Sequence, residues 1–254
     1  MPQVLLLGCN TISLALGCSS CGLAGGDNRV VCPGANLLMA REPLFQSCRI
    51  ACSDGELLAD LVIPQAAMGV VLFAHGSGSN RQSPRNRAVA AALQQAGLAT
   101  LLLDLLPAQA TPQPGLGCAL DQARCNLLTA VDWTGTDPRL SALPLGLFGA
   151  SSGAATALDV AALRPERVRA VVCRGGRPDL AFEALGLVRC PTLLIVGSQD
   201  VDVLELNAWA AAHLRTRHDL LVIPAAGHLF AEPGALEAVA AASCSWFVDQ
   251  LPRG

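Results

Sequence analysis

The 254-residue chain contains no lysine and no tyrosine, and its 17 basic side chains are all arginine. Charged residues make up 15% of the chain and aromatic residues 4%, whereas hydrophobic residues make up 52%. Disordered chains combine low hydrophobicity with high net charge, and this chain carries a net charge of only −3, so we expect a folded protein. The arginines are scattered along the sequence instead of forming a basic stripe, which excludes nucleic acid as an expected partner.

The sequence also lacks the uninterrupted apolar run of roughly 18 residues that a membrane-spanning helix needs, so we expect no membrane span. Apolar stretches at Val4–Leu7 and Ile12–Leu16 raise the question of a secretory signal. However, no basic residue precedes Arg29, and a signal peptide begins with a positively charged region. We therefore expect a cytoplasmic protein, with export through a degenerate signal as the alternative. The sequence leaves a monomer and a homodimer equally open.

Eleven cysteines are many for this length, and six of them lie within the first 52 residues. Their odd total argues against a complete disulfide framework. Cys18 and Cys21 form a C-x-x-C pair, but no second pair follows at the spacing of a zinc site. We expect reduced thiols and no metal, in a poorly defined N-terminal extension over residues 1–43.

From residue 44 onward, apolar runs of strand length alternate with segments of helical periodicity. Phe45–Ala51 and Glu56–Ile63 flank Ser53-Asp54-Gly55 and predict an antiparallel hairpin. The short apolar strands that follow alternate with helices, which predicts a mostly parallel sheet covered on both faces, in one domain over residues 44–254. The expected strands are Gly69–Ala74, Ala99–Leu105, Leu143–Phe148, Val168–Cys173, Cys190–Val196 and Leu220–Ile223, and the expected helices are one between Pro84 and Gly97, Leu116–Trp133, Ser152–Leu163, Val203–Leu214 and Pro233–Leu251.

A G-x-S-x-G motif, Gly149-Ala150-Ser151-Ser152-Gly153, stands between an expected strand and an expected helix. In this context the serine occupies a strained strand-to-helix turn, where the flanking glycines permit close backbone approach. The turn lifts the hydroxyl of Ser151 above the sheet and places it at a helix N-terminus, whose dipole favours developing negative charge. Ser151 is therefore the candidate nucleophile.

A serine hydroxyl needs a base to take its proton, and the candidate base is His228. His228 follows the expected strand Leu220–Ile223, and Asp200 follows the expected strand Cys190–Val196. The chain order serine, acid, histidine is the order in which α/β-hydrolases present their triad, in which the aspartate orients the imidazole and stabilises its cation. Asp202 is the alternative acid.

The segment His75-Gly76-Ser77 follows the expected strand Gly69–Ala74 and is the candidate oxyanion loop. An oxyanion hole needs two backbone N–H groups that converge on the tetrahedral intermediate. We assign one to Ser152, which follows the nucleophile, and one to Ser77. His75 is interpreted as a residue that orders this loop, because the base is already assigned.

Arginines gather at the same edge of the expected sheet, beyond the carboxyl ends of its strands, where parallel-sheet enzymes bind ligands. Arg174 and Arg177 follow one strand, and Arg81 and Arg85 lie in or just after the oxyanion loop. A guanidinium presents a planar fork that suits a carboxylate, so Arg81 and Arg174 are candidate substrate-binding residues. The alternative is that these arginines pair with Asp179, with Asp104 or with each other's neighbours and tie loops together.

Six segments between residues 73 and 230 carry a resemblance to a known family: Phe73–Arg81, Ser83–Arg87, Leu102–Leu106, Gly149–Gly153, Arg174–Leu180 and Gly227–Phe230. Over residues 44–254 the chain resembles the α/β-hydrolase superfamily and, more narrowly, its small, lidless dienelactone hydrolase-like members. The resemblance implies an α/β-hydrolase fold without a large lid, and it places the family's triad on Ser151, Asp200 and His228. Dienelactone hydrolase itself uses a cysteine nucleophile, whereas residue 151 is serine.

These features predict a serine hydrolase that cleaves a small-molecule carboxylic ester through an acyl-enzyme and needs no metal or organic cofactor. Acyl transfer and the cleavage of lactones or amides on the same triad are alternatives, because a fold does not fix the reaction. A non-catalytic binding protein with this fold is the alternative from another class.

Overall fold

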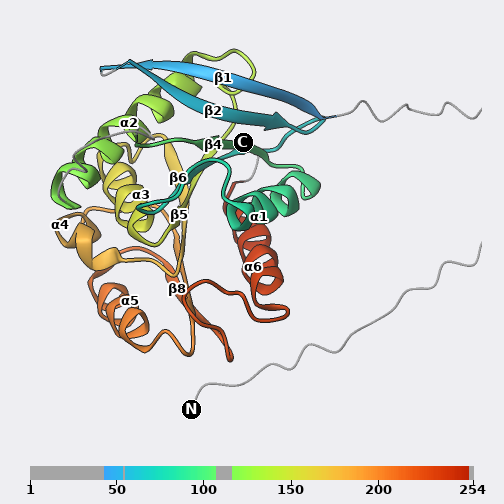
Figure 1. Cartoon of the computed structure of the whole chain (residues 1–254). Coiled ribbons are helices and arrows are strands. Elements are labelled where there is room, and N and C mark those ends of the chain that lie inside the picture. The colour runs from blue at the N-terminus through green and yellow to red at the C-terminus, as the bar shows by residue number, and fades with distance from the viewer. Residues whose placement is uncertain (1–42, 54, 107–115, 252–254) are drawn as a thin grey trace, which may run out of the picture. The chain divides into compact units, whose positions relative to one another are not determined.

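The computed structural model describes residues 43–53, 55–106 and 116–251 of the chain (Figure 1). The expected N-terminal extension, with its C-x-x-C pair and apolar stretches, lies outside the described residues except for residue 43. Within the described ranges, no group of His, Cys, Asp and Glu side chains is suited to hold a metal ion. None of the helices in these ranges has the length and apolar character of a membrane span.

One sheet of eight strands organises residues 44–223, in the order β1-β2-β4-β3-β5-β6-β7-β8. Strands β3 to β8 run parallel, whereas the hairpin β1–β2 pairs antiparallel with β4 at one edge. This confirms the predicted α/β fold class and the antiparallel N-terminal hairpin. The strands are β1 (Leu44–Cys52), β2 (Gly55–Ile63), β3 (Val70–Ala74), β4 (Ala99–Leu103), β5 (Leu145–Ala150), β6 (Val168–Arg174), β7 (Thr192–Gly197) and β8 (His218–Ile223).

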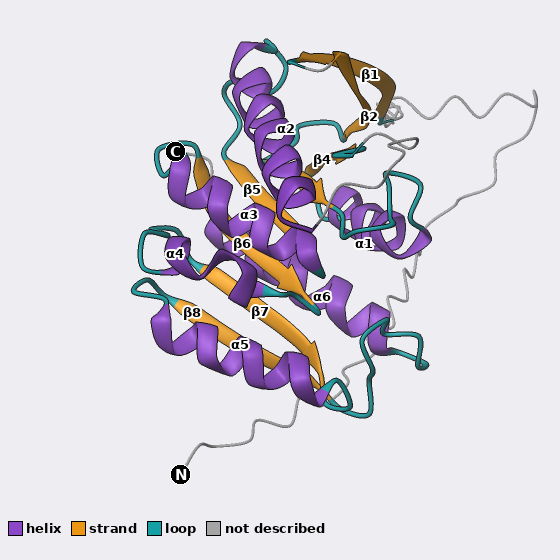
Figure 2. Cartoon of the chain, turned by 60° about the vertical axis from the view of Figure 1, so that its left-hand side comes forward, coloured by secondary structure: helices purple, strands orange, loops and turns teal. Residues whose placement is uncertain are grey.

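Helices cover both faces of the sheet, as Figure 2 shows: α1 and α6 lie on one face, and α2, α3 and α5 lie on the other. The central strands β3, β4, β5 and β7 are buried along their whole length, because each of their faces packs against helices. The helices are α1 (Pro84–Gln95), α2 (Leu116–Thr136), α3 (Ser152–Leu163), α4 (Phe182–Leu185), α5 (Val201–His213) and α6 (Ala235–Gln250), with a 3-10 turn at Pro178–Ala181.

The observed elements differ from the predicted ones at several places. Strand β5 extends to Ala150, and β6 extends to Arg174, because the two ends pair with each other in register. His218, which we expected just before a strand, is the first residue of β8. The segment from Pro178 to Leu185 forms a 3-10 turn and a short helix, for which the sequence had predicted no element.

Candidate active site

Ser151 stands at the turn between β5 and α3, with a backbone φ of 53° and ψ of −125°. A positive φ strains a residue with a side chain by on the order of 1–3 kcal/mol, and it persists only where the surroundings enforce it. Here the Ser151 N–H donates to the carbonyl of Arg174 (3.1 Å), and the Ser151 carbonyl accepts the N–H of Arg177 (3.0 Å). The end of β6 therefore holds this strained turn in place.

The two glycines of the motif are required by close backbone approach. A Cβ at Gly149 would lie 2.5 Å from the Cα of Ala154, and a Cβ at Gly153 would lie 2.2 Å from the carbonyl oxygen of Ala74. Any side chain at either position would displace the backbone. The motif thus packs the start of α3 directly against β3 and β5, which fixes the direction of the turn that carries Ser151.

His228 and Asp200 are brought together by the loops that follow β8 and β7. The Nδ1 of His228 lies 2.6 Å from Oδ2 of Asp200. Asp200 precedes α5 but makes no side-chain hydrogen bond to its first turn, so its carboxylate is free to orient the imidazole. Asp202, the alternative acid, is an exposed residue in the first turn of α5.

The turn at the end of β6 lies against both the candidate nucleophile and the candidate base. Arg174 binds the N–H of Ser151 through its carbonyl. Gly175 has a φ of 51°, and a Cβ there would lie 3.5 Å from Nδ1 of His228. Ser151 and His228 thus lie against consecutive residues of one turn, which places them at the same edge of the sheet.

Ser77 and Ser152, the two candidate oxyanion donors, lie side by side. The Ser77 N–H donates to the hydroxyl Oγ of Ser152 at 2.9 Å, and the two hydroxyls are 3.1 Å apart. The preceding residue, Gly76, approaches the turn so closely that a Cβ there would lie 3.0 Å from the Cβ of Ser151. The loop after β3 therefore lies on the nucleophile turn, and the Ser77 N–H points towards it.

Both ring nitrogens of His75 bond to backbone groups. Its Nε2 accepts the N–H of Leu105 at 2.8 Å, so Nδ1, 3.0 Å from the carbonyl of Gly76, carries the proton and donates to it. Burial lowers the pKa of His75 below 6.5, which keeps the ring neutral. Asn126 of α2 completes the contact by donating to the carbonyl of Leu105 at 2.9 Å. His75 thus ties the oxyanion loop to the end of β4, and no motif in the sequence pointed to Asn126.

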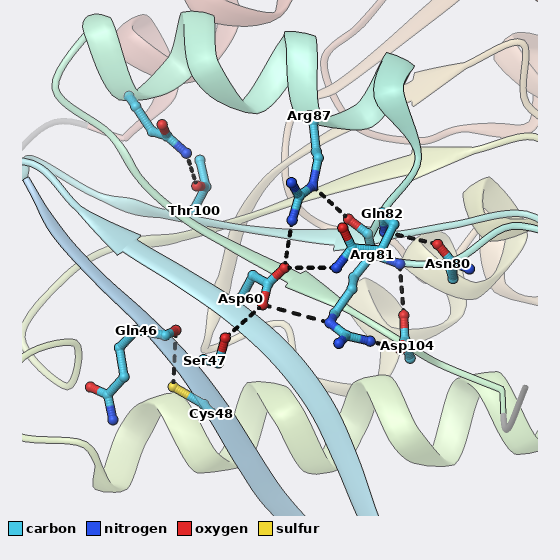
Figure 3. A network of polar contacts seen from close by, with 11 residues as sticks. Gln46, Ser47, Cys48, Asp60, Asn80, Arg81, Gln82, Arg87, Thr100 and Asp104 are labelled. Carbon is cyan, nitrogen blue, oxygen red and sulfur yellow. Dashed lines mark hydrogen bonds and ion pairs between the residues drawn. The ribbon is translucent and has the colours of Figure 1, made fainter.

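Arg81, in the loop between β3 and α1, belongs to a network of polar and charged side chains, which Figure 3 shows. Its guanidinium forms an ion pair with Asp104, and its Nε lies 3.6 Å from Asp60 on β2. The backbone N–H of Arg81 also donates to Asp104 at 2.7 Å. Arg87 of α1 forms a second ion pair with Asp60 at 2.8 Å. The Arg81 guanidinium is therefore engaged by two carboxylates, and it joins the loop to β2 and β4.

Arg174 has a different environment from Arg81 and Arg177. Arg177 forms a two-bond pair with Asp179, with distances of 2.8 and 2.7 Å. Arg174 is buried, and its Nε and Nη1 have no hydrogen-bond partner among the described residues. Its guanidinium lies 5.9 Å above the ring centre of Phe230. Phe230 lies two residues after His228. An aromatic residue in this loop is the sequence feature from which a contact with an arginine could have been inferred.

The remaining histidines lie away from this edge of the sheet. Nδ1 of His213, at the end of α5, lies 2.8 Å from the carbonyl of Trp209, and Nδ1 of His218 lies 2.9 Å from the carbonyl of Thr216. Within the described part of the chain, neither side chain forms a hydrogen bond or ion pair with the residues around Ser151.

A parallel sheet with an antiparallel hairpin at its edge, and a strained serine turn between β5 and α3, define an α/β-hydrolase. Solved structures agree: a dienelactone hydrolase from Anabaena variabilis is 49% identical, covers 82% of this chain and 99% of its own, and superposes with a TM-score of 0.79. The chain belongs to the dienelactone hydrolase family. Est1E from Butyrivibrio proteoclasticus shares the fold at 18% identity, with a TM-score of 0.69 over 80% of this chain and 98% of its own.

Curated relatives give a second comparison. Proteins of Mycobacterium tuberculosis named "Putative phosphoribosyl transferase" are 50% identical over 191 residues, which are 75% of this chain. The match spans 43% of the length of those relatives. No family model matches the chain.

Proposed function

We propose that the protein is a serine hydrolase that cleaves carboxylic esters through an acyl-enzyme, with Ser151, His228 and Asp200 as its catalytic residues. The observation that carries the proposal is the 2.6 Å contact between His228 and Asp200, beside a serine held at φ 53° on the nucleophile turn. A histidine that only supports the fold or faces solvent does not need a carboxylate partner. The pairing of His228 with Asp200, next to such a serine, therefore favours a catalytic role.

In the proposed reaction, the Oγ of Ser151 attacks the ester carbonyl while Nε2 of His228 takes the serine proton. Asp200 keeps Nδ1 of His228 protonated and stabilises the imidazolium that forms. Collapse of the tetrahedral intermediate passes this proton to the leaving alcohol and leaves an acyl-serine. Water, deprotonated by His228, then releases the acid.

We assign the oxyanion hole to the backbone N–H groups of Ser77 and Ser152. In the free protein, the Ser77 N–H is bound to the hydroxyl oxygen of Ser152. This hydroxyl therefore occupies a position that accepts a hydrogen bond beside the nucleophile, and the developing oxyanion replaces it as the acceptor. Backbone donors fixed in this way cost little reorganisation when the negative charge develops.

The phosphoribosyl transferase name of the curated relatives is not carried over to this chain. Those proteins are more than twice as long as the segment that matches, and the described part of this chain has the α/β-hydrolase fold. The proposed reaction uses only side chains and backbone groups of this chain, and its substrate is a small ester.

A fluorophosphonate probe tests the proposal, because it reacts covalently with activated serines. We expect one probe per chain by intact-protein mass spectrometry, and none on Ser151→Ala. Ser151→Ala should also lower kcat for an aryl ester by about 10⁵–10⁶. The matched control is Ser152→Ala, which keeps its backbone N–H and should still be labelled. An unlabelled parent protein, or a labelled Ser151→Ala variant, would refute the assignment.

A further inference from the structure

The side-chain hydroxyl of Ser77 contributes little to the fold. Ser77 is an exposed residue, and its Oγ lies 3.1 Å from Oγ of Ser152. The Ser77 hydroxyl makes no other hydrogen bond within residues 43–53, 55–106 and 116–251. An exposed contact between two hydroxyls adds little stability, because water offers both groups an equivalent partner. The hydroxyl is therefore available to another acceptor when a substrate binds.

Two donors of Ser77 converge on one oxygen atom. The backbone N–H of Ser77 donates to Oγ of Ser152 at 2.9 Å, and the Ser77 hydroxyl lies within hydrogen-bond distance of the same atom. A hydroxyl oxygen has two acceptor lone pairs, so Oγ of Ser152 can accept both groups at once. Ser77 thus defines a position at which a single oxygen receives two hydrogen bonds from one residue.

This oxygen position lies beside the candidate nucleophile. Ser152 directly follows Ser151 and is the first residue of α3. A Cβ at Gly76 would lie 3.0 Å from the Cβ of Ser151 and 3.5 Å from Oγ of Ser152, so the loop that carries Ser77 approaches both side chains. A carbonyl attacked by Ser151 therefore develops its negative charge next to the position that Oγ of Ser152 occupies in the free protein.

We propose that the side-chain hydroxyl of Ser77 is a third donor of the oxyanion hole, in addition to the backbone N–H groups of Ser77 and Ser152. This inference rests on the proposed function. As Oγ of Ser151 bonds to the ester carbon, the π electron pair of the carbonyl moves to its oxygen. This oxygen displaces Oγ of Ser152, whose side chain turns away, and the N–H and O–H of Ser77 both donate to it.

The Ser77 hydroxyl acts on the transition state more than on the bound substrate. A hydrogen bond to an ionised oxygen is roughly twice as strong as one to a neutral oxygen, and the carbonyl oxygen becomes ionised only during the attack. An interaction that strengthens in the transition state raises kcat, whereas one that is equal in both states lowers KM. Loss of the hydroxyl should therefore appear in kcat.

Hydrolysis of an aryl ester by Ser77→Ala tests the proposal, because alanine keeps the backbone N–H and removes only the hydroxyl. We expect kcat to fall by about 10- to 100-fold, with KM within about twofold of the parent. Ser77→Thr restores a hydroxyl and should recover kcat to within about threefold of the parent. The matched control is Ser79→Ala, the same change two residues further along the loop, which should leave kcat within about twofold of the parent. A parent-like kcat in Ser77→Ala would overturn the inference.

A trifluoromethyl ketone gives a readout that a merely structural role would not move. Ser151 adds to the ketone carbonyl, the serine proton passes to His228, and the resulting hemiketal carries an oxyanion. Ser77→Ala should raise the Ki of this inhibitor by the same factor by which it lowers kcat/KM, because both quantities report stabilisation of the oxyanion. An unchanged Ki alongside a reduced kcat would assign the hydroxyl another role and contradict the proposal.

Ser152→Ala separates catalysis from a simple tie between the two hydroxyls. It removes the same contact from the other side but keeps the backbone N–H of Ser152. We expect kcat/KM to rise by about two- to fivefold, because the substrate no longer displaces a resident acceptor. A fall as large as that in Ser77→Ala would show that the contact only holds the loop. A parent protein that neither hydrolyses esters nor reacts with the fluorophosphonate counts against the proposed function, whereas an active parent with an unaffected Ser77→Ala variant counts against this inference alone.

Discussion

At the residue scale, Asp200 shows how one side chain can serve a helix or a site. It stands at the position before α5 where an aspartate commonly caps the first turn. In this protein it makes no such bond and instead contacts Nδ1 of His228. The first turn of α5 keeps Asp202 as its acidic residue, so the favourable interaction with the helix dipole is retained. Asp200 thus contacts the histidine instead of capping the helix.

We predict that Asp200→Asn lowers kcat for an aryl ester by on the order of 10⁴, because the amide favours the wrong tautomer of His228. The control is Asp202→Asn, which removes the same charge two residues away and should leave kcat within about threefold of the parent. Steady-state kinetics on both variants decide the point. If the Asp202 variant loses the activity and the Asp200 variant keeps it, the assigned acid is wrong.

At the scale of elements, the loop after β3 depends on a neutral histidine. His75 accepts the Leu105 N–H and donates to the Gly76 carbonyl, and both contacts are buried. Protonation of Nε2 would turn this acceptor into a second donor facing another N–H group. The contact that His75 makes between this loop and the end of β4 therefore holds only while His75 remains uncharged.

The titration of His75 predicts a pH dependence of stability. Its pKa is lowered below 6.5 by burial, so between the two values the unfolded chain binds the proton more readily than the folded chain. The contribution of His75 is complete above pH 6.5 and is lost as the pH falls through the folded-state pKa. His75→Ala should cost about 1–3 kcal/mol at pH 8 by leaving the Leu105 N–H without an acceptor, and it should flatten the loss below pH 6.5. Urea unfolding across this range measures both effects.

The control for this prediction is His213→Ala, because His213 is exposed at the end of α5. Its stability should follow the pH dependence of the parent protein. A His75→Ala variant whose free energy of unfolding falls below pH 6.5 as steeply as that of the parent would show that other groups cause the acid loss.

At the scale of the whole molecule, two hydrophobic clusters lie on opposite faces of the sheet. All of their buried residues lie between Cys48 and Leu251. Every residue that we assign to the site also lies within this range. The described domain thus contains its own core and its own candidate machinery.

We therefore predict that removal of residues 1–40 leaves the Tm within about 2 °C of the full chain and leaves kcat/KM for an aryl ester within about twofold, since less than 0.5 kcal/mol of stability is involved. Thermal unfolding and ester hydrolysis of the shortened chain check this. A large loss of either, or stoichiometric zinc in the full chain by elemental analysis, would show that the N-terminal cysteines have a structural role.

The sequence predicted what depends on local pattern. The alternation of apolar strands and helices predicted the parallel sheet, and the G-x-S-x-G motif predicted the turn at Ser151, because both are written in neighbouring residues. The sequence offered Asp104 and Asp179 as possible partners of the arginines, but it could not predict which arginine would meet which carboxylate. Arg81 and Arg174 looked alike in the chain, yet Asp60 and Asp104 come to Arg81 from β2 and β4, and no such partner reaches Arg174. The short helix at Phe182–Leu185 was missed because four residues give no helical periodicity.

The contact between Asp200 and His228 joins the loops after the last two strands to be synthesised. A ribosome delivers the chain from its N-terminus, so β5, Ser151 and α3 emerge and can pack well before β8 is available. Until β8 has paired with β7, a nascent chain carries a serine turn without the base that we propose for it. If the proposed triad is correct, such a chain is inert towards esters in its surroundings, and reactivity arises only when the far edge of the sheet is complete.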